Sequence, residues 1–130
     1  MIEEVKKNIE RVLELLREGS GQIVPEFKYG AHLDPDFFEW FSQLRKFCIN
    51  DGKALLAKYR AMIHMCLLAH IGFVRGVASR VEKLIEEHGA TRLEIIEALE
   101  TAMVGGGGPT LVTGIAGLMS YEESKRGKGQ

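Results

Sequence analysis

The chain has 130 residues, of which 45% are hydrophobic and 27% are charged. This length and composition predict one globular domain, residues 1–130, that can bury a core without cross-links. Seventeen basic side chains oppose 18 acidic ones, which gives a net charge of -1. That balance argues against nucleic acid or a membrane surface as the main partner, because both need a concentrated basic surface.

The sequence also bears on the cellular compartment of the protein. Residues 1–11 are charged rather than apolar, unlike a signal peptide. The longest uncharged run, 61–74, is shorter than the roughly 20 apolar residues of a membrane-spanning helix. Two cysteines without a secretion signal are typical of a cytoplasmic protein with reduced thiols. We therefore expect a cytoplasmic protein.

The N-terminal segment has a helical pattern. Apolar residues recur at steps of three and four, which predicts an amphipathic helix over 1–19, and they are Ile2, Val5, Ile9, Val12 and Leu16. The segment 19–32 contains glycine and proline without periodicity, so we expect a loop there.

An aromatic helix follows. Asp34 and Pro35 provide an N-cap and a proline at the first helical position. The apolar positions of this helix predict a core-facing stripe, and they are Phe37, Phe38, Trp40, Phe41, Leu44 and Phe47. Asn50, Asp51 and Gly52 end the helix with turn residues.

The segment 54–72 is apolar on nearly every helical face. A helix of this kind must be covered on all sides, and a chain of this size has little interior to do so. We therefore expect a homo-oligomer with this helix near its centre or at an interface. A further amphipathic helix should run to about His88, with Gly89 as its C-terminal stop.

The remaining segment predicts two helices around a glycine run. Thr91 and Glu94 fit a capping box at the start of the first helix. The four glycines 105–108 and Pro109 predict a reversal into a last helix that ends near Tyr121, followed by a flexible tail, 123–130. A phosphate-binding loop is disfavoured, because no strand precedes the glycines and no Gly-Lys-Ser/Thr follows them. Without any strand pattern, the fold class is all-α, with about six helices.

Candidate chemistry centres on Cys66 and His70. Their i,i+4 spacing places them one turn apart on the same helix face. A nearby imidazole could activate the thiol as a nucleophile or peroxide sensor, whereas a free cysteine more often fills a core as a small hydrophobe. The histidines do not converge on a metal, since His64 and His70 point about 120° apart on a helix. No metal or cofactor is therefore expected.

The second half of the chain resembles the carboxymuconolactone decarboxylase family, which includes the alkylhydroperoxidase D-like proteins. The match covers about 58–121 and is strongest at Gly89-Ala90-Thr91, at the segment 94–98 and at the glycines before Pro109. The resemblance implies an alkylhydroperoxidase D-like helical core over 34–122, assembled as trimers or hexamers. The Cys-x-x-Cys pair and histidine of peroxidase members fall on Val74, Val77 and Val81, and a glutamate of the central helix falls near Ala61.

Two functions follow from these observations. The resemblance implies an enzyme of peroxide reduction or lactone decarboxylation, with Cys66 and His70 as the remaining candidates for catalysis. The alternative is a non-catalytic helical oligomer that binds a small ligand or a protein partner. The three valines favour the alternative, because they replace the reactive groups with a face that can only pack.

Overall fold

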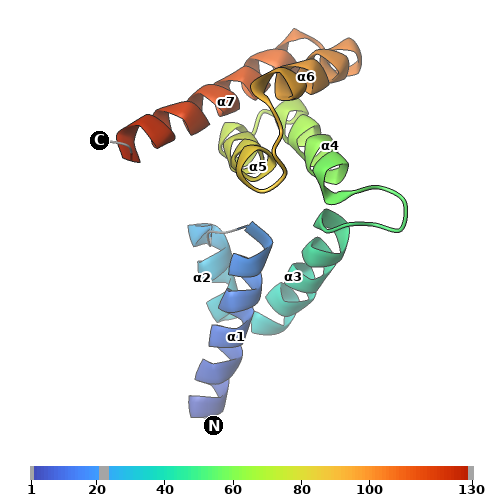
Figure 1. Cartoon of the computed structure of the whole chain (residues 1–130). Coiled ribbons are helices and arrows are strands. Elements are labelled where there is room, and N and C mark those ends of the chain that lie inside the picture. The colour runs from blue at the N-terminus through green and yellow to red at the C-terminus, as the bar shows by residue number, and fades with distance from the viewer. Residues whose placement is uncertain (1, 21–23, 129–130) are drawn as a thin grey trace. The chain divides into compact units, whose positions relative to one another are not determined.

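A computed structural model describes residues 2–20 and 24–128, and the described residues form seven α-helices without strands (Figure 1). The all-α class is therefore confirmed. The helices are α1 (Ile2–Ser20), α2 (Pro25–Leu33), α3 (Pro35–Ile49), α4 (Ala57–His70), α5 (Val74–Glu86), α6 (Arg92–Gly106) and α7 (Gly108–Lys128). None of the described helices is long and apolar enough to span a bilayer.

The chain divides into two compact units, residues 1–52 and 53–130. The division falls within the helical core 34–122 that the resemblance implies, so α3 belongs to a different unit from α4 through α7. Each unit contains a buried cluster of its own.

In the first unit, α1 packs against α2 and α3. Val12, Leu16 and Ala31 are buried, with Phe38 and Phe41 packed against them. Ion pairs at the surface join α1 to α3, from Arg11 to Glu39 (2.8 Å) and from Lys46 to Glu18 (3.2 Å).

The loop expected over 19–32 was wrong, because most of this segment belongs to the helix α2. Pro25 occupies the first turn, where its missing N–H costs no hydrogen bond, and Phe27 packs on the core of the unit. This helix of nine residues buries only Ala31 fully. Its sequence therefore has no apolar periodicity, which is the signal of an amphipathic helix. Residues 21–23 of the expected loop lie outside the described part of the chain.

The predicted caps of α3 and α6 are present. The Asp34 carboxylate accepts a hydrogen bond from the Phe37 N–H at 3.2 Å. Thr91 and Glu94 form the reciprocal capping box, with both hydrogen bonds at 3.0 Å. Gly89 has a positive φ of 65° after α5, as its role of helix stop requires.

The core stripe expected on α3 is only partly correct. Phe38 and Phe41 pack against the buried cluster, but four other members of the stripe are exposed: Phe37, Trp40, Leu44 and Phe47. An aromatic-rich helix that is apolar over a wide arc cannot bury all of it in a unit of three helices.

In the second unit, α7 contacts α4, α5 and α6 (Figure 1). The core contains Met65, Leu84, Ile95 and Leu99, all fully buried. The glycine reversal lies where the sequence placed it, although α6 continues to Gly106 and only Gly107, with φ of 87°, is left between the helices. The last helix extends to Lys128, beyond the end expected near Tyr121.

The valine face of α5 packs as expected at two of its three positions. Val77 and Val81 are fully buried, whereas Val74, in the first turn, is 37% exposed. Val77 faces Gly117 of α7 so closely that a Cβ on that glycine would collide with the valine side chain. Ala61, where the family's glutamate would fall, is also buried in this core.

Replacing Val77 with Asp should therefore unfold the second unit. The substitution buries an unpaired carboxylate, which we expect to lower the free energy of unfolding by about 3 kcal/mol or more. The matched control is Val104→Asp, at an 85% exposed valine of α6, with an expected change within about 0.5 kcal/mol. Chemical denaturation followed by circular dichroism measures both, and equal stability of the two variants would contradict the packing.

Candidate functional site

A groove of about 540 Å³ lies between α4 and α6 in the second unit. One wall is a face of α4, and the other is a row of small residues on α6. The wall on α4 consists of Met62, Ile63, Cys66, Leu67 and His70, and the wall on α6 consists of Ala98, Thr101, Ala102, Gly105 and Gly106. The α6 residues recur at helical spacing, so one face of that helix lacks bulk along its length. The groove exists because these small side chains cannot fill the space beside α4.

Two contacts fix α4 relative to α6 and show that the two helices run in the same direction. At their start, the Lys58 ammonium pairs with the Glu94 carboxylate at 2.8 Å. In the middle, the Cys66 thiol donates to the Ala98 carbonyl at 3.6 Å. The first contact, together with the hydrogen bond from the Thr91 N–H, lowers the pKa of Glu94.

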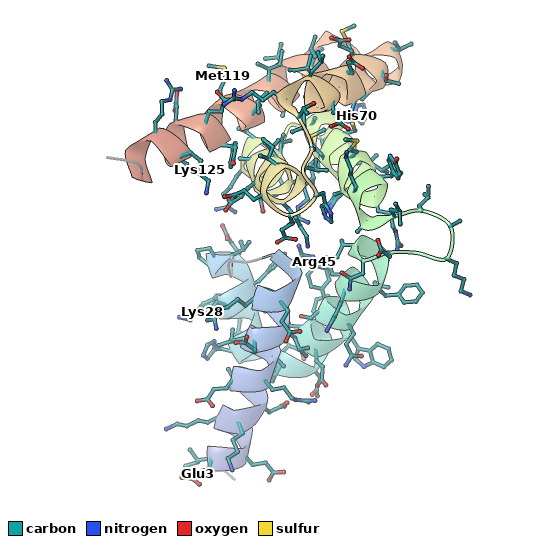
Figure 2. All side chains as sticks on the ribbon, viewed as in Figure 1. Glu3, Lys28, Arg45, His70, Met119 and Lys125 are labelled. Carbon is teal, nitrogen blue, oxygen red and sulfur yellow. The ribbon has the colours of Figure 1, made fainter. Side chains whose placement is uncertain are left out.

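A further contact joins α4 to α7, because His70 at the end of α4 meets the start of α7. His70 Nδ1 lies 3.4 Å from Oγ1 of Thr110, a residue that is only 1% exposed. Gly106 lies against both residues, and a Cβ there would be 2.9 Å from His70 Nδ1 and would collide with the Thr110 hydroxyl. Figure 2 labels His70 at this end of α4. The imidazole is therefore held through Nδ1 at one end of the groove.

Cys66 is half-buried in the groove wall. Desolvation by burial raises the pKa of its thiol. A raised pKa keeps the sulfur protonated at neutral pH, and its proton points to a backbone carbonyl. The environment of Cys66 thus favours the neutral thiol over the nucleophilic thiolate.

The predicted pair, Cys66 and His70, lines one groove, but the two side chains have different hydrogen-bond partners. The thiol contacts Ala98 and the imidazole contacts Thr110. The assignment of the pair as nucleophile and base remains a prediction. Thr110 and Gly106 were not predicted from the sequence. The recurrence of small residues at Ala98, Ala102 and Gly105 does indicate a face of α6 that cannot fill the space beside it.

The other residues considered for chemistry lie elsewhere. Cys48 is exposed on α3 in the first unit. The His32 ring nitrogen contacts the Lys28 carbonyl at 2.8 Å, and the buried His88 Nε2 has no hydrogen-bond partner among the described residues. Over the described ranges, no three His, Cys, Asp or Glu side chains gather as metal ligands.

A second hollow, of about 610 Å³, lies near the C-terminal end of α7 and contains charged side chains. Arg92 pairs with Glu122, and Lys125 pairs with Glu86 at 2.5 Å. The pKa of Tyr121 in its wall is raised, first by burial and then by Glu86. Because Arg92 and Lys125 are already paired with carboxylates, these two cations offer little to a ligand.

The environment of His70 should depend on Gly106. Gly106→Ala places a methyl group against His70 and Thr110, so we expect a displaced imidazole and a loss of about 1–3 kcal/mol in stability. The matched control is Gly105→Ala, where a Cβ meets no atom within 4 Å and the change should be neutral or slightly stabilising. Ring signals of His70 in NMR spectra and thermal melts distinguish the two, and identical behaviour would contradict the crowding at Gly106.

No family model, curated protein or solved structure matches this chain.

Proposed function

We propose that the second unit binds a small, neutral, largely apolar molecule in the α4–α6 groove. The observation that carries this proposal is the composition of the groove wall, which has apolar and small side chains and no Asp, Glu, Lys or Arg. Its volume lies within the range typical of small-molecule sites, and its few polar groups, chiefly His70 and Thr101, can orient a ligand without neutralising a charge. A charged ligand would lose its hydration without a partner of opposite sign.

This ligand-binding function is non-catalytic. The raised pKa of Cys66 supports it, because a protonated thiol is a poor nucleophile. The burial of Val77 and Val81, where the resembling family has its reactive groups, supports it as well. We propose that the protein acts in the cytoplasm. We also propose a homo-oligomer, since α4 has exposed apolar side chains at Tyr59 and at Ile63 and Leu67 of the groove wall.

Protection of Cys66 tests occupancy of the groove. In a Cys48→Ser background, Cys66 is the only thiol of the chain. Decanol should slow its alkylation by iodoacetamide, and decanoate or decylammonium at the same concentration should do so less, because their charges meet no partner in the groove. If none of the three changes the rate, the groove does not bind this class of ligand.

Filling the groove provides the structural control. Ala102→Phe places a ring in the groove, and we expect the affinity for decanol, measured by calorimetry, to fall at least about tenfold. Val104→Phe adds the same ring at an exposed position of the same helix and should leave the affinity unchanged. Equal affinities in the two variants would place the binding site elsewhere.

A second candidate is thiol-dependent peroxide reduction at Cys66. The observation that favours it is that Cys66 and His70 line the same groove. The Cys66 sulfur would attack a peroxide oxygen and become a sulfenic acid, while the other oxygen leaves as water or an alcohol, and an added thiol would restore the cysteine. This candidate predicts turnover that is lost in Cys66→Ser and retained in Cys48→Ser. Absence of turnover in the unmodified protein would remove it, whereas binding of decanol would be unaffected.

A further inference from the structure

The two walls of the α4–α6 groove have the same repeat along their helices. On each helix a lining residue recurs at every fourth position, so both helices face the groove once per turn. These residues are Met62, Cys66 and His70 on α4, and Ala98, Ala102 and Gly106 on α6. Each series spans eight residues, which is about 12 Å at roughly 1.5 Å per residue. Because the two helices run in the same direction, the groove follows them for about two turns.

An ion pair closes the groove at its start. Lys58 lies one turn before Met62, and Glu94 lies one turn before Ala98, so the two residues continue the two walls. Their ammonium and carboxylate groups meet at 2.8 Å and join α4 to α6. An apolar chain that passed beyond Met62 would have to separate these charges and would gain no apolar contact in return.

The start of α7 bounds the groove at its other end. His70 contacts the buried Thr110 in the first turn of α7, and Gly106 lies against both residues. The exposed side chains of His70 and Thr101 make this end polar and open to water. At the other end, Met62 and Ala98 are apolar and half-buried. The groove therefore has an apolar end and a polar end.

We propose that the ligand of this groove is an unbranched aliphatic chain of about eight to ten carbons, since an extended chain advances roughly 1.2 Å per bond and about ten atoms then span the groove. Its polar group lies at the His70 end, and its methyl end lies beside Met62. This inference rests on the ligand-binding function proposed above and names the class of ligand. A chain of this shape contacts the small residues of α6 at every turn, whereas a compact ring system with as many carbons reaches fewer turns.

A series of alcohols tests the length of the ligand. In the Cys48→Ser chain, the concentration that half-protects Cys66 from iodoacetamide is measured for hexanol, octanol, decanol and dodecanol. Each added methylene should raise the affinity roughly threefold up to decanol, because the groove walls remove it from water. Dodecanol should bind no more tightly than decanol, because its last carbons reach the ion pair. Adamantanol, which has as many carbons as decanol, should bind at least about tenfold more weakly.

Removal of the ion pair should move this limit. Lys58→Ala deletes the side chain that closes the start of the groove, so dodecanol should then bind more tightly than decanol. Lys125→Ala is the matched control, because it removes the ion pair with Glu86, which lies outside the groove, and the limit should stay at decanol. Circular dichroism confirms that both variants are folded.

The orientation of the chain has its own measurement. In NMR spectra of the complex with decanol, the terminal methyl of the ligand should show cross-relaxation with the Met62 methyl. The first methylene, beside the hydroxyl, should show it with the His70 ring. The opposite pattern would overturn the orientation.

The outcomes separate this inference from the proposed function. If decanol protects Cys66 but the affinity of the unmodified groove keeps rising to dodecanol, or adamantanol binds as tightly as decanol, the inference fails and the ligand-binding function stands. An unchanged limit in Lys58→Ala would also overturn the inference, because the ion pair would then not close the groove. If none of the alcohols protects Cys66, the ligand-binding function fails together with the inference.

Discussion

The second unit depends on the close approach of α7 to its neighbours. Two glycines of α7 permit it: Gly117 receives Val77 of α5, and Gly114 receives Leu99 of α6. A methyl group at either position would collide with the side chain that it faces, so the glycines set how near the helices lie. The glycines thus bring α5 and α6 each close to α7. The groove lies on the face of α6 toward α4, where small residues leave the space between the two helices unfilled.

The environments of Cys66 and His70 in the groove do not favour covalent chemistry. Burial raises the pKa of Cys66 and directs its proton to the Ala98 carbonyl, so the sulfur is held in its less reactive form. His70 is oriented by Thr110 at the other end of the groove. A nucleophile and a base require a shared proton, and here each side chain has a different partner. These contacts agree with our proposal of a neutral ligand that has one polar group and an apolar body.

Much of the architecture was predictable because its signals are local. The capping box of Thr91 and Glu94, the N-cap at Asp34 and the helix stop at Gly89 each depend on residues within one or two turns, and all three are present. The short helix α2 was not predictable in this way, because it buries few residues and has no apolar period. The mostly exposed stripe on α3 was also missed, because periodicity reveals that a face is apolar but not whether its own unit has enough partners to cover it.

The sequence by itself determined the all-α class, most helix boundaries and the helical face shared by Cys66 and His70, since all of these follow from spacing of 3.6 residues per turn and from local capping. The tertiary structure decided which side chains meet. It placed Thr110 and Gly106 beside His70, and it gave Cys66 a carbonyl as its partner. These contacts join residues 32 to 40 positions apart, where the outcome depends on how several helices pack at once and not on the pattern of any one helix.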